Sequence, residues 1–414
     1  MASLNEEVLR SVISNCSVPL ILRGFVKNWS ICQWSVEKWT SVFGEKQIPL
    51  RCMKKDFLTD EPCWERRCSK KSMTFKEFLD VSSKGEEWMY FDYKYVYQWF
   101  NGDDELYKGI SWKEFGFPEK GASDATLWVG SKGAHTPAHI DTYGVNIVTQ
   151  LHGTKRWIIF PPGTEGLKPT RVPYEESSIY SEVNFFCPNN LDVFSGLKGA
   201  RVVDLHAGDV LIMPWRWWHY VQNVDPLNIS LNVWLPEVCR QLLDQDSSAR
   251  VSEALIKLFV AQICKDLPQE TARLIVNPNE DDIADTPLSV LFLQLETVAN
   301  AHLDKKRKLR RAKRQKTCEE EPSDTLVEYD LKALLDNKAN NLEEVPTVTS
   351  EELVKLVKRN VDEFVNKDRP LCDEEIDGST SPLCLTKAVI NAYSDSNVID
   401  LVKQNLFARL SSMS

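Results

Sequence analysis

Between residues 86 and 236 the chain alternates short apolar runs with turn residues, and this pattern constrains the fold more than any other feature. The runs have the length and composition of β-strands. They cover residues 88–96, 125–129, 145–151, 156–160, 202–205, 210–213, 217–221 and 229–234. Glycine-containing turn sequences, such as those at 130–133, 152–153 and 207–209, separate several of them. Many short strands with such turns predict an antiparallel sandwich or a double-stranded jelly-roll barrel.

The flanking regions have different patterns. Residues 1–85 mix helical and extended signals, with a helix expected at 4–14 and a short extended segment at 18–24, so we expect an α/β decoration there. Residues 237–414 form a helical C-terminal region with helices predicted at 249–266, 288–303 and 385–408 and from Thr349 onward. Thr349 and Glu352 have the spacing of a capping box. We therefore predict three regions, 1–85, 86–236 and 237–414, of which 86–236 is the β core.

Composition excludes several classes of protein. The chain has 414 residues and a net charge of −10, so binding of nucleic acid over its whole surface is not expected. It has no apolar run near the length of a membrane helix, which is about 20 residues, and no visible secretory signal. Its 11 cysteines include no CxxC pair, which favours reduced thiols and a cytoplasmic or nuclear location.

A basic run at residues 305–316 contrasts with the acidic chain. Such a run is most often a solvated charged face or a disordered loop. Nuclear targeting and local contact with nucleic acid are the two functional alternatives.

A histidine and an aspartate two residues apart begin the candidate site. His139 and Asp141 project to one face if residues 133–141 form a strand. This pair alone is common and can be two solvated polar groups. His219, among tryptophans near the start of another predicted strand, supplies a second imidazole. Two imidazoles and one carboxylate can occupy one face of an octahedral metal, as in non-haem Fe(II) oxygenases.

With these residues, the sequence resembles the JmjC-type cupins of the 2-oxoglutarate/Fe(II) hydroxylase family. The stretch 133–162 resembles the asparaginyl hydroxylases that inhibit hypoxia-inducible factor. Residues 92–95, 112–118 and 171–178 resemble JmjC proteins associated with a small heat-shock protein. The resemblance covers about residues 18–236 and implies a double-stranded β-helix with Fe(II) at His139, Asp141 and His219.

The resemblance also implies a cosubstrate site. Lys155 matches the lysine that pairs with the distal carboxylate of 2-oxoglutarate. Thr136 matches a residue whose hydroxyl hydrogen-bonds the same acid. Asn146 and Asn232 match amides of that pocket, Tyr90 matches a phenol donor, and Trp234 matches an aromatic wall beside the metal. Without the resemblance, a solvated lysine and ordinary strand packing would explain Lys155 and Tyr90.

The expected activity is therefore hydroxylation of a protein side chain, with Fe(II) as cofactor and 2-oxoglutarate as cosubstrate. One alternative is a non-catalytic module that binds a small heat-shock protein. Another is a JmjC lysine demethylase, which would need a polar or aromatic cage for the methylated side chain. The apolar helix faces at 249–266 and 353–365 are expected to pack on the β core or to form a homodimer interface.

Overall fold

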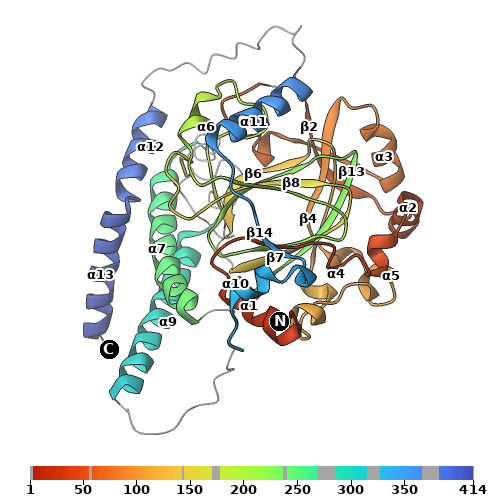
Figure 1. Ribbon diagram of the computed structural model, residues 1–414. Coiled ribbons are helices and arrows are strands. Elements are labelled where there is room, and N and C mark those ends of the chain that lie inside the picture. The colour runs from red at the N-terminus through yellow and green to blue at the C-terminus, as the bar shows by residue number, and fades with distance from the viewer. Residues whose placement is uncertain are drawn as a thin grey trace. The chain divides into compact units, whose positions relative to one another are not determined.

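The computed structural model describes residues 3–55, 58–141, 144–169, 178–235, 240–268, 286–314, 327–365 and 382–413. The chain forms two compact units (Figure 1). The first contains residues 1–168, 181–238 and 326–369, and the second contains residues 169–180, 239–325 and 370–414. Part of the C-terminal third of the sequence thus belongs to the same unit as the β core.

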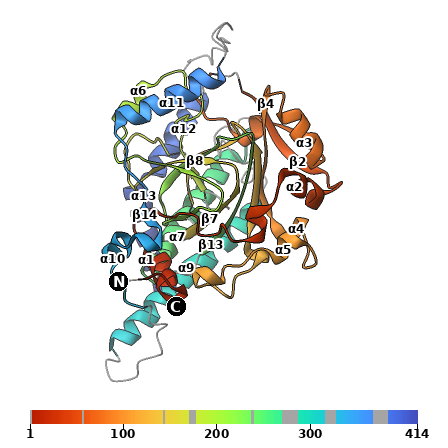
Figure 2. The same ribbon diagram turned by 45° about the vertical axis from the view of Figure 1, so that its right-hand side comes forward.

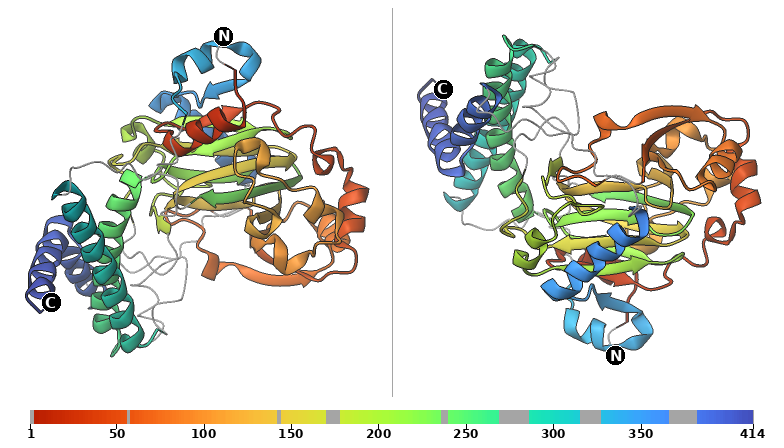
Figure 3. Two further views of the ribbon diagram at one scale, coloured as in Figure 1. Left: turned by 90° about the horizontal axis from the view of Figure 1, so that it is seen from below. Right: turned by 90° about the horizontal axis from the view of Figure 1, so that it is seen from above.

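The first unit is built on two antiparallel sheets (Figure 3). The larger sheet has the order β14-β1-β11-β7-β13-β5-β4-β2-β3. In that order its strands are Leu342–Glu344, Leu20–Leu22, Val210–Met213, Val145–His152, Leu227–Leu235, Thr126–Ser131, Glu87–Tyr95, Ile48–Lys54 and Ser69–Met73. Within this unit the smaller sheet runs β10-β8-β12-β6, which are Arg201–Leu205, Lys155–Phe160, Trp218–Asn223 and His135–Asp141. The prediction of a mainly β, jelly-roll type core with helical flanks is confirmed.

The central strands of the larger sheet are buried on both faces. In β13, Leu231 and Val233 belong to the hydrophobic core on the outer side of the sheet. Their neighbours Asn232 and Trp234 point the other way and line a cavity. Because successive side chains of a strand alternate between faces, one strand supplies both the core and the cavity wall.

N-terminal helices cover the outer core of the larger sheet (Figure 1). They are α1 (Glu6–Asn15), α2 (Val36–Phe43), α3 (Phe75–Ser82), α4 (Val96–Trp99) and α5 (Glu105–Lys108). Side-chain caps begin the first three: Asn5, Ser35 and Thr74 each accept a hydrogen bond from a backbone N–H of the first turn. Buried aromatic residues such as Trp39, Phe43 and Phe75 fill the space beneath them.

Helix α11 (Ser350–Phe364) packs on the β core, near α6 (Asp192–Gly196), and follows the short helix α10 (Leu331–Asp336) (Figure 2). The predicted capping box of Thr349 and Glu352 is present. Leu353 is fully buried, Phe364 contacts Phe186 with ring centroids 4.9 Å apart, and Gln222 of β12 donates a 3.1 Å hydrogen bond to Asn360. The apolar face expected at 353–365 therefore packs on the β core.

The second unit contains helices α7 (Arg240–Cys264), α9 (Leu288–Arg314), α12 (Pro382–Tyr393) and α13 (Ser396–Met413), and the short strand β9 (Ser178–Tyr180). Two apolar clusters hold its helices together. In place of the single helix expected at 385–408 there are two helices, separated by Ser394 and Asp395. The carboxylate of Asp395 accepts a hydrogen bond from the backbone N–H of Asn397. The basic run continues α9 to Arg314, and its last residues lie outside the described part. No helix among the described residues is long and apolar enough to cross a membrane.

Candidate metal centre and cosubstrate pocket

Strands β6 and β12 bring the three candidate metal ligands together. His139 and His219 are register partners across these antiparallel strands, and their ring centroids are 4.1 Å apart. The Nε2 atom of His139 lies 3.5 Å from Oδ1 of Asp141, and Nε2 of His219 lies 3.7 Å from Oδ2. Among the described residues, these three side chains form the cluster of possible metal ligands, and their ligand atoms all lie within 4.8 Å of one another.

Backbone carbonyl groups orient both imidazoles. Nδ1 of His139 donates to the carbonyl oxygen of Pro137 at 2.9 Å, and Nδ1 of His219 donates to that of Trp217 at 3.0 Å. These bonds place the proton on Nδ1 and turn the Nε2 lone pair of each ring toward Asp141. Burial, with His139 close by, lowers the pKa of His219 to about 4, so its imidazole is neutral near pH 7.

The carboxylate of Asp141 is held by hydrogen bonds to one of its two oxygens. Oδ2 accepts bonds from Nδ2 of Asn146 and from Nε1 of Trp234, both at 3.0 Å. Burial alone would raise the pKa of Asp141, but His139, His219 and Trp234 hold it well below its usual range. The Asp141 side chain is therefore a carboxylate. Both N–H donors bind Oδ2, so Oδ1 is the oxygen that can bind a cation.

A chain of amides extends this support. Asn232 donates to Oδ1 of Asn146 at 2.9 Å, and the indole of Trp128 donates to Oδ1 of Asn232 at 2.7 Å. The family resemblance implies that both asparagines line the cosubstrate pocket. They do line the cavity, and their amides also connect Trp128 to the candidate metal ligand.

A β-bulge in β6 places Thr136 in the same cavity as His139. His219 pairs with His139 and Val221 pairs with Thr136, so one residue of β12 lies opposite Pro137 and Ala138 of β6. In a regular strand, residues three apart face opposite sides. The extra residue of the bulge therefore brings both side chains to one face, and proline is tolerated at such a position.

Lys155, at the start of β8, is a buried cation that faces the cavity. Its Nζ donates to the hydroxyl of Ser230 at 2.7 Å and lies 3.5 Å from the phenol oxygen of Tyr90. Burial lowers the pKa of Lys155 to about 7 from its ordinary 10.5, and among the described residues no charged group offsets that effect. A buried ammonium without an anion is unfavourable, so this end of the cavity is suited to a carboxylate.

A glycine allows Tyr90 its position. Tyr90 of β4 pairs with Gly130 of β5, and a methyl group on Gly130 would lie 2.8 Å from the Tyr90 ring and 2.2 Å from the amide of Asn223. Burial raises the pKa of Tyr90, so its hydroxyl stays protonated and can donate to an anion.

All the predicted site residues line this one cavity, whose empty volume is about 390 Å³ with its open mouth included. Sequence reasoning missed Trp128, Val148, Trp157, Val221 and Ser230, which line it too. A period of two would have found most of them. Ser230 lies two residues before Asn232, Trp157 two after Lys155, Val148 two after Asn146, and Val221 two after His219.

The residues fit the metal and the cosubstrate that the resemblance implies. Two imidazole nitrogens and one carboxylate oxygen form a donor set that suits Fe(II), and each of the three side chains has a hydrogen-bonded outer partner. The buried Lys155 supplies the charge that a dicarboxylate needs at its far end. Two antiparallel sheets that enclose such a cluster define a cupin-type protein with a candidate metal centre.

Comparison with known proteins places this chain. A family model described as a cupin-like domain matches residues 6–241. The chain belongs to this cupin-like JmjC family, which includes oxygenases and demethylases and generally uses Fe(II) and 2-oxoglutarate.

Several curated proteins are similar over long stretches. The HSPB1-associated protein 1 homolog of Danio rerio is 33% identical over 351 residues, which are 81% of this chain and 74% of the relative. HSPB1-associated protein 1 of Homo sapiens is 36% identical over 316 residues, 72% of this chain and 62% of the relative. Lysine-specific demethylase 8 of Xenopus tropicalis is 26% identical over 225 residues, 52% of this chain and 47% of the relative. The chain thus spans less than two thirds of the human protein.

Proposed function

We propose that this chain is an Fe(II)- and 2-oxoglutarate-dependent oxygenase that hydroxylates a side chain of a protein. The observation that carries the proposal is the buried amine of Lys155, which shares one cavity with the His139, Asp141 and His219 cluster and can pair with a carboxylate there. A pure binding module needs neither feature, whereas a 2-oxo dicarboxylate uses both. When bound, the iron and the 2-oxo acid would supply the oxidising chemistry.

The chain's own residues have distinct proposed tasks. His139, Asp141 and His219 hold the metal through Nε2, Oδ1 and Nε2. Lys155 pairs with the distal carboxylate, while the hydroxyls of Tyr90 and Thr136 donate to it. The apolar walls of Trp157 and Val148 exclude water from the cavity.

Aromatic residues at the strand end beside the cavity support a protein as substrate. Tyr93 and Tyr97 of β4 and α4 are 40% and 53% exposed. The ring of Tyr93 lies 5.6 Å from that of Trp234, which lines the cavity. Tyrosine and tryptophan are enriched at protein interfaces, because their rings combine an apolar body with a polar atom.

Substrate-independent turnover tests the oxygenase proposal. We expect the anaerobically iron-loaded protein to bind 2-oxoglutarate and, once air is admitted, to release succinate. Asp141→Ala should lose iron and cosubstrate together, whereas Lys155→Ala should keep iron and lose cosubstrate. Asp204→Ala is the matched control, because Asp204 pairs only with Arg156 among the described ion pairs and does not line the cavity. Iron-loaded wild type that neither binds 2-oxoglutarate nor releases succinate would contradict the proposal.

A binding role is the alternative for the same domain. The relatives' names describe association with HSPB1, and we propose a small heat-shock protein as a partner or substrate of this chain. Binding to a purified small heat-shock protein, measured for wild type and for Lys155→Ala and His219→Ala, separates the roles. Equal binding by all three would make the partner independent of the candidate site.

The demethylase alternative finds less support in the rings near the cavity. The ring centroid of Tyr93 lies 5.6 Å from that of Trp234 and 5.8 Å from that of Trp128, so these rings contact one another. A methylated ammonium group would sit between ring faces, whereas these three rings pack against one another. Assay of a trimethyl-lysine peptide for formaldehyde release tests this alternative.

We also propose a cytoplasmic location, with the basic run 305–316 as a candidate nuclear-import signal. Replacing the basic residues of this run by Gln and following a fluorescent fusion in cells tests the signal. An unchanged distribution would exclude it.

A further inference from the structure

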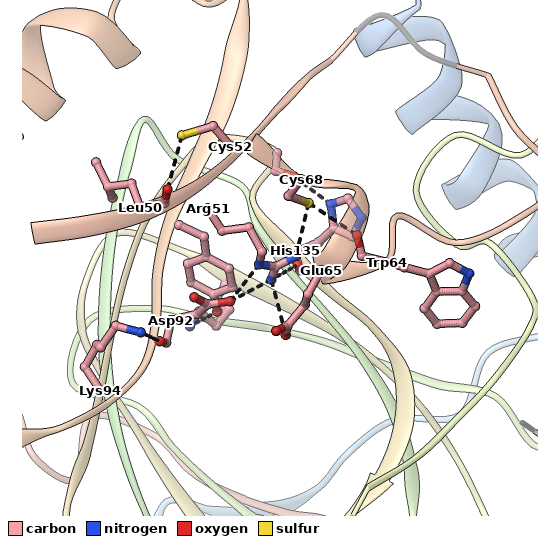
Figure 4. A network of polar contacts seen from close by, with 12 residues as sticks. Leu50, Arg51, Cys52, Trp64, Glu65, Cys68, Asp92, Lys94 and His135 are labelled. Atoms are coloured by element: carbon pink, nitrogen blue, oxygen red, sulfur yellow. Dashed lines mark hydrogen bonds and ion pairs between the residues drawn. The ribbon is translucent and has the colours of Figure 1, made fainter. Parts of the chain in front are cut away.

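A buried arginine outside the cavity connects the N-terminal strands to the cosubstrate pocket. Arg51 of β2 is 6% exposed and lies at the centre of a polar network (Figure 4). Its Nε and Nη2 atoms lie 2.9 Å and 2.7 Å from Oδ2 of Asp92, and Nη2 lies 4.0 Å from the carboxylate of Glu65. Nη1 lies 3.8 Å from the sulfur of Cys68.

Asp92 reaches this guanidinium because of a second β-bulge. Phe91 pairs with Val129 and Lys94 pairs with Leu127, so Asp92 and Tyr93 of β4 lie opposite one residue, Trp128, of β5. Tyr93 has a positive φ of 54°, which is unusual for a bulky residue. The bulge thus turns Asp92 toward Arg51 and Tyr93 toward Trp128 and Trp234.

Arg51 lies against the ring of Tyr90 and bonds the backbone next to Thr136, the two proposed hydroxyl donors to the cosubstrate. It is the register partner of Tyr90 across β2 and β4, and its guanidinium carbon lies 5.7 Å from the centre of the Tyr90 ring. On its other side, Nη2 donates to the carbonyl oxygen of His135 at 3.3 Å. His135 directly precedes Thr136, so this bond fixes the backbone from which the Thr136 hydroxyl enters the cavity.

We infer that Arg51 is a positioning residue for the distal carboxylate of the cosubstrate, acting through Tyr90 and Thr136 rather than by contact. This inference rests on the proposed function and adds a determinant of its selectivity for diacids. The planar guanidinium makes several hydrogen bonds in fixed directions, whereas a lysine ammonium at this position would keep the charge beside Asp92 without that geometry.

The experiment compares two 2-oxo acids of equal chain length on full-length protein. 2-Oxoglutarate carries the distal carboxylate, and 2-oxopentanoate has a methyl group in its place. Dissociation constants for both are measured with anaerobic Fe(II)-loaded wild type, Arg51→Lys and Arg51→Gln, together with iron affinity and the midpoint of thermal unfolding. Arg156→Lys is the matched control, because Arg156 pairs with both oxygens of Asp204 at 2.7 Å and does not line the cavity.

Arg51→Lys should weaken 2-oxoglutarate binding about tenfold, and Arg51→Gln by more, the loss expected for a misplaced charge-assisted bond. Binding of 2-oxopentanoate and of iron should stay within about twofold in Arg51→Lys. Arg156→Lys should change neither the affinity for 2-oxoglutarate nor the affinity for 2-oxopentanoate. Because Arg51→Lys keeps the buried charge beside Asp92, it tests the inference even if Arg51→Gln does not fold.

Two negative outcomes are distinguishable. If wild type prefers 2-oxoglutarate to 2-oxopentanoate and Arg51→Lys keeps that preference, Arg51 has a structural role alone and the inference is wrong. A parallel loss of both acids in Arg51→Lys also overturns it. If wild type binds iron but not 2-oxoglutarate, the proposed function fails first, and the inference falls with it.

Discussion

The ammonium nitrogen of Lys155 lies 2.7 Å from the hydroxyl oxygen of Ser230, so a neutral group is the close partner of a buried cation. Neutral oxygen atoms compensate only part of the cost of removing a charge from water. The first two predictions follow from the resulting pKa of about 7.

Cosubstrate binding should take up a proton above neutral pH. In the free protein Lys155 has a pKa of about 7, and a bound distal carboxylate favours the charged form and raises that pKa. The affinity for 2-oxoglutarate should therefore fall by up to about tenfold for each pH unit above 7. Calorimetry in buffers of different ionisation enthalpy measures the proton uptake directly. Lys155→Met should bind weakly and without this uptake.

Lys155→Met should stabilise the cosubstrate-free protein. The unfolded chain holds the lysine proton up to pH 10.5, while the folded protein loses it at about pH 7. Stability from this group therefore rises with pH between these values, and the full cost of burial is present below about pH 7. Urea unfolding should show the largest gain for Lys155→Met near neutral pH and a much smaller gain near pH 10. A gain that is equal at both pH values would point to packing instead.

Trp234→Phe should weaken metal binding while it keeps an aromatic wall. The substitution removes the N–H donor to Oδ2 of Asp141, and loss of such an outer partner typically costs about 10- to 100-fold in metal affinity. Titration with Mn(II) under anaerobic conditions measures the effect. Trp112→Phe removes a comparable indole bond, to the carbonyl of Gly121, from the outer core and should leave metal affinity unchanged.

Gly130→Ala should weaken cosubstrate binding through Tyr90. The new methyl group would meet the Tyr90 ring and the Asn223 amide inside their contact distances, so the ring must move. We expect reduced affinity for 2-oxoglutarate, with iron affinity close to that of wild type. Gly196→Ala, where an added methyl meets no neighbouring atom, is the control. Unchanged 2-oxoglutarate affinity in Gly130→Ala would remove Tyr90 from the proposed site.

Leu353→Ala should destabilise the first unit by about 2–5 kcal/mol, because a fully buried leucine of α11 would leave a cavity against the β core. Urea denaturation of the whole protein measures this change. Glu351→Ala, an exposed position on the same helix, should have little effect. Wild-type stability in Leu353→Ala would mean that α11 is a detachable part of the chain.

Local patterns predicted the β core and the ligand cluster because strands and turns have short-range signatures. Val210–Met213, for example, has the predicted bounds. The bulges in β6 and β4 escaped prediction, since a period of two assumes regular strands, and they decide where Thr136, Asp92 and Tyr93 point. Packing of the 353–365 face on the β core was one of two expected outcomes, but the hydrogen bond between Gln222 and Asn360 had no sequence signal, because these residues meet only in the folded chain. The roles assigned to the site residues remain predictions.

Alternate residues of strand β13 face the outer core and the cavity. Leu231 and Val233 specify the outer core, while Ser230, Asn232 and Trp234 build the cavity wall between them. Inserting or deleting one residue in this strand would exchange the two sets and send polar groups into the core. Point substitutions leave this alternation intact, and exposed residues such as Tyr93 and Tyr97 can be replaced without disturbing either set.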